Sequence, residues 1–265
     1  VGNDKKEAGM MIFARIDVGS RTIKVVLLNE KKLIASSITD QGVTGRDLMK
    51  AVYSKALRAA GVRHSQVRRT VATGYGRNSV AFADTTITEI SCQARGVRQV
   101  EPDARTVIDI GGQDSKLIRL DKDGAVRDFA MNDRCAAGTG RFLEVVASRL
   151  NTKLASVGRL LGRARARASI SSTCVVFAET EIIGLLASGE KRENILAGVL
   201  TSIATRIAAM AGRSLDQPVV FTGGVALIPG MARALEDELG CKVRISASPQ
   251  ITCALGAATL AAELG

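Results

Sequence analysis

Two hydrophobic periods alternate along the chain, and they predict strands and helices in turn. Runs rich in β-branched residues and bounded by turn residues predict strands over 11–16, 22–28, 33–38, 67–72, 106–110, 116–120, 218–221 and 242–246. Apolar residues that recur on one helical face predict helices over 47–60, 138–150, 175–187, 194–211, 231–239 and 252–264. Because strands and helices alternate rather than segregate, the pattern indicates an α/β fold.

The strongest internal signal is a repeated phrase. The segments 16–24 and 108–116 share Ile-Asp, then Val or Ile, then Gly, followed by four residues and a Lys. In each copy one predicted strand enters the Asp-Gly turn and another leaves it, so each copy is a strand, a tight turn and a second strand. The repeat therefore predicts two similar halves that face each other across a cleft.

The composition is that of a globular chain with a positive charge balance. The chain has 265 residues, of which 46% are hydrophobic and 24% charged, enough for one large domain or two of moderate size. The formal net charge of +11 favours an anionic partner, and nucleotide phosphates, coenzyme A and an acidic protein all fit. Aromatic residues make up only 3%, without Trp, which argues against base-stacking surfaces for single-stranded nucleic acid.

The residues that several classes of function require are missing from the sequence. His64 is the single histidine, which argues against a Ser/His/Asp triad and a two-His zinc site. No stretch approaches the roughly 20 apolar residues that span a bilayer, and residues 1–9 lack the apolar centre of a signal peptide. We therefore expect a cytoplasmic protein that binds neither a membrane nor nucleic acid.

Each Asp-Gly turn combines a carboxylate with backbone N–H groups that a ligand can approach closely. Asp17 and Asp109 could hold Mg²⁺ through water, while Gly19, Ser20, Gly111 and Gly112 receive phosphate oxygens. One such turn alone is more often a plain hairpin, but two copies with a matching Lys favour a ligand site. The Walker A pattern is absent, and Gly138-Thr139-Gly140 lacks the third Gly of a dinucleotide fingerprint.

A third glycine element, Gly223-Gly224, follows the strand predicted over 218–221 and could carry an adenosine on exposed backbone. Together the three segments resemble the sugar kinase, Hsp70 and actin superfamily, in which two phosphate loops and an adenosine loop occur in this order. The resemblance implies two actin-like (ribonuclease H-like) halves around an ATP cleft: 10–95 with the C-terminal helix 250–265 packed back onto it, and 96–249.

The same resemblance assigns roles to single residues. Gln113 is a candidate to orient the attacking water, because its amide can both donate and accept a hydrogen bond. With Gln113, the carboxylates Asp17 and Asp109 are the candidate catalytic residues. The resemblance implies nucleotide contacts at Gly19, Ser20, Lys24, Gly111, Gly112, Lys116, Gly223 and Gly224.

Five cysteines are an odd and sparse set, so a disulfide framework is not expected. Cys135 and Cys174 each precede a predicted helix, whose N-terminal backbone N–H groups stabilise a thiolate. A cuboidal iron–sulfur cluster needs four thiolates, so two such chains around a twofold axis would complete the set. By composition alone, two small packing cysteines are the more common interpretation. Structural roles are expected for Cys92, Cys241 and Cys253.

Four long phrases, at 72–78, 108–116, 131–142 and 170–179, resemble the activator component of 2-hydroxyacyl-CoA dehydratases. That component belongs to a broader family with the ATP-binding subunits of benzoyl-CoA reductase. The resemblance implies a homodimer with one bridging 4Fe-4S cluster, held by Cys135 and Cys174 of each chain. It also implies ATP hydrolysis that drives one electron, supplied by a ferredoxin or flavodoxin, to an iron–sulfur acyl-CoA dehydratase or reductase component.

Three alternatives stay open at this point. One is an ATP-binding subunit of a benzoyl-CoA reductase-type enzyme, another is a small-molecule kinase of the same fold, and the third is a nucleotide switch without catalysis. A run of basic residues before the second cysteine segment is most often a solvated face, and its alternative is docking of an acidic partner: Arg159, Arg163, Arg165 and Arg167.

Overall fold

The computed structural model describes residues 11–30, 32–41, 46–171, 174–212 and 214–263. The chain forms two compact units: the residues up to Gln99 with those from Ile251 onward make unit 1, and Val100–Gln250 make unit 2. Residues 10 and 264–265, which the sequence assigns to the first half and to the C-terminal helix, lie outside the described residues.

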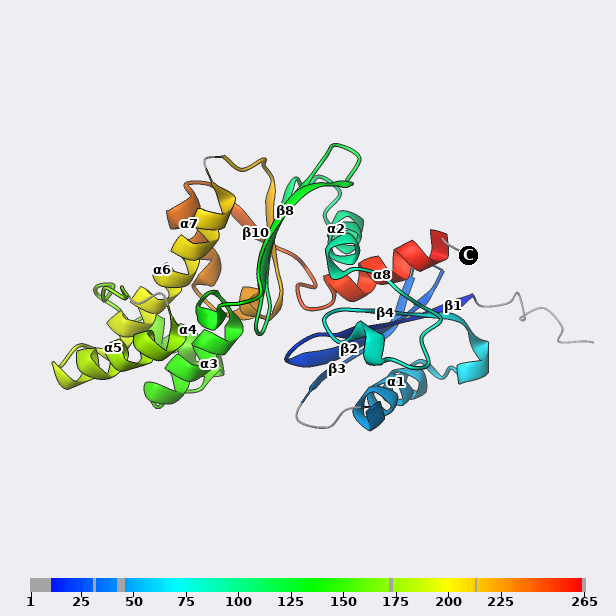
Figure 1. Ribbon diagram of the computed structural model, residues 1–265, viewed down its shortest axis with the longest axis horizontal. Coiled ribbons are helices and arrows are strands. Elements are labelled where there is room, and N and C mark those ends of the chain that lie inside the picture. The colour runs from blue at the N-terminus through cyan, green and yellow to red at the C-terminus, as the bar shows by residue number, and fades with distance from the viewer. Residues whose placement is uncertain (1–10, 31, 42–45, 172–173, 213, 264–265) are drawn as a thin grey trace, which may run out of the picture. The chain divides into compact units, whose positions relative to one another are not determined.

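Unit 1 is built on one five-stranded sheet in the order β3-β2-β1-β4-β5. Helix α1 contacts β2 and β3, while α8 contacts β1, β2 and β4, and Figure 1 shows α1 on one side of the sheet with α8 and α2 on the other. The elements are β1 (Ile12–Val18), β2 (Thr22–Asn29), β3 (Lys32–Asp40), α1 (Arg46–Ala60), β4 (Val67–Thr73), β5 (Thr85–Thr86), α2 (Glu89–Val100) and α8 (Thr252–Glu263).

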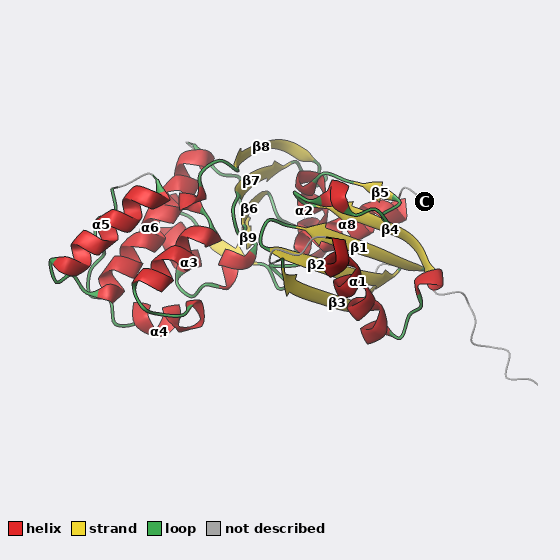
Figure 2. Cartoon of the chain, turned by 60° about the horizontal axis from the view of Figure 1, so that its bottom comes forward, coloured by secondary structure: helices red, strands yellow, loops and turns green. Residues whose placement is uncertain are grey.

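Unit 2 repeats this plan with a second five-stranded sheet in the order β10-β9-β6-β7-β8. Helix α6 fills the core against the sheet, and Figure 2 shows α3, α4 and α5 gathered around it. The elements are β6 (Thr106–Ile110), β7 (Ser115–Leu120), β8 (Val126–Asn132), α3 (Gly140–Arg149), α4 (Val157–Leu161), α5 (Val175–Ala187), α6 (Arg192–Ala211), β9 (Val219–Thr222), α7 (Met231–Leu239) and β10 (Val243–Ile245).

The strand orders of the two sheets correspond one to one. In each, a central strand pairs antiparallel with the strand that follows it and parallel with a later strand: β1 with β2 and β4, and β6 with β7 and β9. The repeated phrase is the central hairpin of each sheet, because Asp17 lies opposite Lys24 and Asp109 lies opposite Lys116. The predicted α/β class and the predicted strand, turn and strand of each copy are confirmed.

The predicted strands and helices are present, with ends that differ by one to two residues at most positions. The short helix α4 was not predicted from the sequence, because five residues are too few to establish a period. Helix α6 is long and apolar enough to cross a membrane, but 56% of its most apolar stretch is buried inside the protein. That burial is typical of a core helix.

Arg15, in the middle of β1, is a charged residue inside the core of unit 1. Its side chain is fully buried, and burial lowers the pKa of this guanidinium to about 9. The guanidinium donates to the carbonyl oxygens of Ala257, at 2.5 Å, and Ala258, at 3.0 Å, both in α8. Arg15 therefore links the central strand β1 to the C-terminal helix α8 by hydrogen bonds, although the two are far apart in sequence.

The burial of Arg15 predicts a clear difference between two substitutions. Arg15→Ala leaves a cavity under α8 and is expected to lower the free energy of unfolding by ~3 kcal/mol or more. Arg15→Met fills most of that volume without burying a charge and is expected to unfold close to or above the parent midpoint. Denaturant titration measures both, with the exposed Arg68→Ala as a control that changes little. Equal losses for the two Arg15 variants would contradict this account.

Candidate functional site

The first Asp-Gly loop joins β1 to β2 in unit 1. Its turn is closed by the N–H of Gly19, which donates to Thr22 O at 3.0 Å. Asp17 is 4% exposed, and its Oδ2 accepts a hydrogen bond from Lys24 Nζ at 2.9 Å. Gly19 and Ser20 are partly exposed at the turn itself. The loop thus places a buried ion pair beside accessible backbone.

The end of β4 holds this loop in place. Gly74 follows β4 with φ +86°, and a Cβ built there would lie 2.4 Å from Asp17 Oδ1 and 2.6 Å from Val18 O. The N–H of Gly76 donates to Val18 O at 2.9 Å. Tyr75, between the two glycines, is 83% exposed. The sequence pattern assigns this stretch no chemical role, yet its backbone forms the support of the Asp17 carboxylate.

The second Asp-Gly loop has the same construction in unit 2. The N–H of Gly111 donates to Asp114 O at 2.9 Å. Lys116, buried to 4% exposure, lies 3.7 Å from Asp109 Oδ2 and forms a closer ion pair with Asp114. Gln113 is exposed at the turn. The predicted phosphate-loop residues of this half are therefore brought together by one hairpin.

Gly223 occupies the same position in unit 2 that Gly74 occupies in unit 1. It follows β9 with φ +88°, and a Cβ built there would lie 2.2 Å from Ile110 O and 2.9 Å from Asp109 Oδ1. The preceding Thr222 donates from Oγ1 to Asp109 Oδ1 at 3.0 Å. Gly224 follows directly. The predicted adenosine turn therefore lies against the second phosphate loop.

This geometry suits an anionic ligand with a divalent cation. In both units the carboxylate and the turn lie at the carboxyl end of a central strand, which is where ligands bind in open α/β sheets. The accessible N–H groups of a glycine turn can receive phosphate oxygens, and an aspartate next to a lysine offers both a cation ligand and a positive charge. A sugar-phosphate or nucleotide would fit this chemistry.

The second loop is also hydrogen bonded to the start of α3. The N–H of Gly140 donates to Gly111 O at 2.9 Å, and that of Arg141 donates to Gly112 O at 2.8 Å. A Cβ built on Gly140 would lie 3.0 Å from Gly111 O, so the two backbones are in direct contact. No sequence pattern signals this link, which connects the phosphate loop to the segment that follows Cys135.

Cys135 and Cys174 both lie in unit 2, and each directly precedes a helix. Cys135 comes before the short 3-10 helix Ala136–Gly138 that leads into α3, and Cys174 comes before α5. The side chain of Asn132 brackets Cys135, since its Nδ2 donates to Cys135 O at 2.7 Å and its Oδ1 accepts from Cys135 N at 3.1 Å. Both cysteines are partly exposed.

The helices behind the two cysteines pack together and leave an apolar surface uncovered. Helices α3 and α5 are in contact, and Arg149 of α3 forms an ion pair with Glu179 of α5. On α5, Val176 is 65% exposed and Phe177 is 68% exposed. These large apolar side chains follow Cys174 directly in the chain. Large exposed apolar side chains beside a thiol are typical of a surface that another protein covers.

The described residues contain no group of three or more His, Cys, Asp or Glu side chains that could hold a metal ion. Two thiols per chain therefore fit a cluster only as half of its ligand set.

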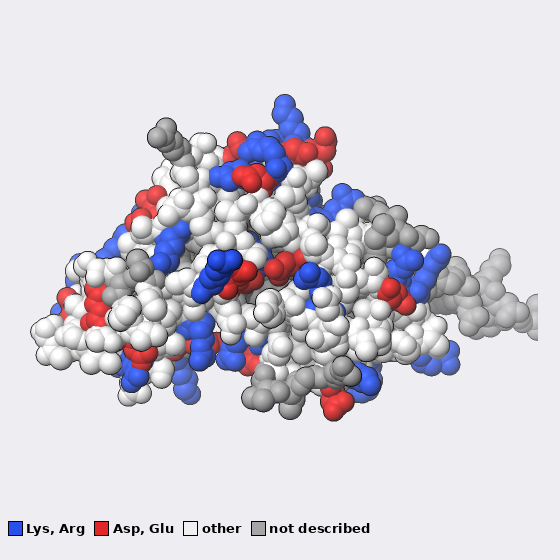
Figure 3. Space-filling view, viewed as in Figure 1, with Lys and Arg blue, Asp and Glu red and all other residues white. Residues whose placement is uncertain are grey.

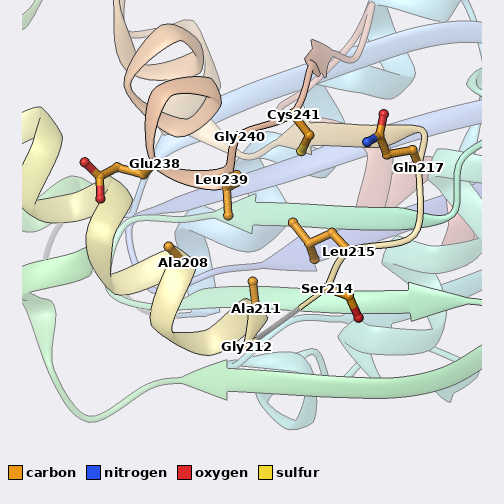
Figure 4. A pocket seen from close by; sticks show the side chains of 10 residues that line it. All are labelled: Ala208, Ala211, Gly212, Ser214, Leu215, Gln217, Glu238, Leu239, Gly240 and Cys241. Carbon is orange, nitrogen blue, oxygen red and sulfur yellow. The ribbon is translucent and has the colours of Figure 1, made fainter.

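A cavity of about 300 Å³ lies elsewhere in unit 2, between the end of α6 and the end of α7 (Figure 4). Its lining residue Gln217 lies just before β9, whereas Gly223 and the second loop lie past the end of that strand. Burial and the nearby Glu236 raise the pKa of Cys241, one of its lining residues. The cavity is lined by Ala208, Ala211, Gly212, Ser214, Leu215, Gln217, Glu238, Leu239, Gly240 and Cys241.

The basic run before Cys174 is exposed at all four arginines. Arg167 is paired with Asp237, and Arg159 donates to Ser156 Oγ at 3.2 Å. Figure 3 shows positive side chains in small groups with acidic side chains between them on the visible face. This distribution fits a solvated surface.

The chain matches a known ATPase family over most of its length. The pattern of the BadF/BadG/BcrA/BcrD ATPase family matches residues 16–261. The chain is similar to an activator of lactoyl-CoA dehydratase from Anaerotignum propionicum, with 47% identity over 94% of this chain and 96% of that protein. It is also similar to an (R)-2-hydroxyglutaryl-CoA dehydratase activating ATPase from Acidaminococcus fermentans, with 43% identity over 93% of this chain and 95% of that protein.

Solved structures agree with these relationships. The activator of the 2-hydroxyisocaproyl-CoA dehydratase from Clostridium difficile, with bound ADPNP, superposes with a TM-score of 0.91 at 40% identity, covering 96% of this chain and 95% of that one. A ROK hexokinase from Thermus thermophilus, at 14% identity and a TM-score of 0.55, shares the fold alone. The expected actin-like, sugar-kinase-like fold is therefore confirmed.

A more distant relative is a benzoyl-CoA reductase subunit from Thauera aromatica, with 34% identity over 87% of this chain and 84% of that protein. The close relatives are activators of 2-hydroxyacyl-CoA dehydratases, as the sequence phrases indicated. The chain belongs to the BadF/BadG/BcrA/BcrD ATPase family.

Proposed function

We propose that this protein is a homodimeric iron–sulfur ATPase that couples ATP hydrolysis to low-potential transfer of one electron to a 2-hydroxyacyl-CoA dehydratase. The observation that carries the proposal is the presence, in one chain, of two Asp-Gly phosphate loops and two partly exposed cysteines, each directly before a helix. Relatives described as dehydratase activators, similar over more than nine-tenths of the chain, support the choice of partner.

The nucleotide contacts are proposed residue by residue. Asp17 and Asp109 hold Mg²⁺ through water, and Gly19, Ser20, Gly111 and Gly112 receive phosphate oxygens. Lys24 and Lys116, already paired with the aspartates, neutralise the charge around the phosphates. Gly223 and Gly224 carry the adenosine, and the exposed Gln113 orients the attacking water. The ADPNP in the similar solved structure supports a nucleotide as ligand.

Cys135 and Cys174 are the proposed ligands of the 4Fe-4S cluster, two from each of two chains. A cluster supplies a centre that accepts and gives up one electron. The chain's own contribution is to present both thiols at helix starts, where backbone N–H groups favour negative charge. The exposed Val176 and Phe177 beside Cys174 supply an apolar surface that the second chain would cover.

The hydrogen bonds between the second loop and α3 are the proposed route from phosphate chemistry to the cluster. A change in the Gly111-Gly112 turn on hydrolysis moves the N–H groups of Gly140 and Arg141, and with them the segment after Cys135. Small shifts of hydrogen bonds and solvent exposure around an iron–sulfur centre change its potential. For a one-electron couple, 59 mV corresponds to about 1.4 kcal/mol.

The remaining parts of the proposal concern the surroundings of the enzyme. We place it in the cytoplasm, reduced by a ferredoxin or flavodoxin, without nucleic acid or membrane as partner.

The second candidate function is an ATP-binding subunit of a benzoyl-CoA reductase-type enzyme, which the similarity to the Thauera aromatica reductase favours. A small-molecule kinase is the weaker candidate, because the sugar kinase neighbour shares only the fold.

The assignment of Cys135 and Cys174 as cluster ligands predicts that iron binding can be lost while nucleotide binding is kept. Protein purified without oxygen should be brown, dimeric and contain ~4 iron atoms per two chains. Cys135→Ala or Cys174→Ala should remove the iron and the visible absorption, while ADP binding measured by calorimetry stays close to that of the parent. Cys241→Ala is the matched control and should keep its iron. A folded Cys135→Ala protein that retains full iron would refute the ligand assignment.

The close contact between Gly74 and Asp17 predicts a selective loss of nucleotide binding. Gly74→Ala pushes a Cβ against the carboxylate and is expected to weaken Mg²⁺-ATP binding ~10- to 100-fold, the range of one charge-assisted hydrogen bond. Gly61→Ala is the control, because Gly61 also has a positive φ but a Cβ built on it would meet nothing within 4 Å. Both variants should lose ~1–2 kcal/mol of stability from the positive φ, and Gly74→Ala should lose more, because its Cβ also meets Val18 O. Equal nucleotide affinity in the two variants would show that Asp17 is not involved.

The contact between Gly140 and Gly111 predicts an uncoupled enzyme. Gly140→Ala adds a Cβ 3.0 Å from Gly111 O and should disturb the link while both binding sites remain. We expect ATP-dependent reduction of the dehydratase to fall ~2- to 30-fold per ATP hydrolysed, with iron content unchanged. Gly184→Ala in α5, with open space at its Cβ, is the control. An unchanged ratio of electrons transferred to ATP hydrolysed would eliminate this route.

A further inference from the structure

Two of the cysteines outside the proposed cluster site contact each other inside unit 1. Cys92 lies in α2 and is fully buried, and Cys253 lies in α8 and is partly exposed. Cys253 packs against the buried cluster that contains Cys92. Its thiol donates to Glu89 O at 3.8 Å, one turn before Cys92. This packing brings the two thiols near each other, as a disulfide requires.

The helices that carry them cross in direct backbone contact. A Cβ built on Gly96 of α2 would lie 1.7 Å from Thr252 O, and one built on Gly256 of α8 would lie 1.7 Å from Cys92 O. Gln93 adds a hydrogen bond from Nε2 to Thr252 Oγ1 at 2.9 Å. Disulfides join residues whose Cα atoms are about 4.4–6.8 Å apart, and only helices packed this closely bring their residues into that range.

The two crossing helices lie at the points where the chain passes between the two units. Helix α2 ends at Val100, directly after the chain leaves unit 1, and α8 begins at Thr252, one residue after the chain returns to it. The side chain of Thr73 lowers the pKa of Cys92, and Thr73 lies opposite Asp17 in the sheet and precedes Gly74. The thiol pair therefore lies behind the first phosphate loop.

We propose that Cys92 and Cys253 are a redox modification site that closes to a disulfide and ties α2 to α8. With hydrogen peroxide as oxidant, the two S–H bonds and the O–O bond break and one S–S bond forms. Both thiol hydrogens leave in the two water molecules that the peroxide becomes. The thiols lose two electrons, and the peroxide oxygens gain them.

The two thiols influence each other's protonation. Contact with Cys253 lowers the pKa of Cys92, and the charge of Arg15 acts in the same direction. The same contact, together with burial, raises the pKa of Cys253 well above its usual value. Loss of a proton from one thiol therefore disfavours its loss from the other.

Peptide mapping tests the proposal directly. The full-length protein is treated with hydrogen peroxide, alkylated, and digested with trypsin without reduction. Cleavage after Arg77, Arg95 and Arg244 leaves Cys92 in peptide 78–95 and Cys253 in peptide 245–265. We expect these two peptides to appear cross-linked and to separate after dithiothreitol. Oxidation should also raise the thermal unfolding midpoint by several degrees, because the link constrains a long loop of the unfolded chain.

Variants separate this pair from the other thiols. Cys253→Ala should abolish the cross-linked peptide and the midpoint shift, while Cys241→Ala should retain both. A full-length Cys135→Ala/Cys174→Ala variant should still form the link, which removes any contribution from the cluster ligands. Failure to find the cross-linked peptide in the folded parent protein, or recovery of Cys92 as a sulfinic acid with Cys253 still reduced, would overturn the proposal. None of these readouts depends on ATP hydrolysis.

Discussion

The structure depends on one contact that occurs twice: a glycine at the end of a parallel strand touches the aspartate at the end of the central strand. Gly74 leaves no room for a Cβ beside Asp17, and Gly223 leaves none beside Asp109. Each carboxylate is thereby fixed against backbone on one side and faces its lysine on the other. Hydrogen bonds from Lys24 to Asp17 and from Thr222 to Asp109 add to this contact in fixing the orientation of each carboxylate.

The elements around this glycine–aspartate contact differ between the two units. In unit 1, the Gly74–Gly76 turn at the end of β4 contacts Asp17 and Val18. The thiol pair of α2 and α8 packs against Val71 of β4. In unit 2, the Gly111-Gly112 turn is instead hydrogen bonded to α3, which leads back to Cys135. The duplicated topology therefore supplies two equivalent Asp-Gly loops, but among the described contacts it is the second loop that is bonded to the segment after Cys135.

The sequence predicts the features that are local in the chain, whereas contacts between residues far apart in the chain could not be predicted from it. The hairpins with Asp17 and Asp109 were predicted because strand, turn and lysine are local in sequence. The correspondence of Thr73-Gly74 with Thr222-Gly223 was missed, because two residues are too short a phrase and the pairing of β1 with β4 and β6 with β9 is non-local. The burial of Arg15 was equally hidden, since a charged residue in a strand is expected to be exposed unless the partner helix is known.

The cysteines show why residue type alone does not decide chemistry. Cys135 and Cys174 are partly exposed, directly precede helices and have an apolar surface beside them. Cys92 and Cys253 meet at a helix crossing where the backbones touch, so their reactive partner is already present within the chain. As proposed cluster ligands, Cys135 and Cys174 supply two of the four thiolates, and a second chain would supply the other two. The proposed disulfide of Cys92 and Cys253 is two-electron chemistry within one unit. The two proposals thus assign different chemistry to the same residue type from its burial and its neighbours.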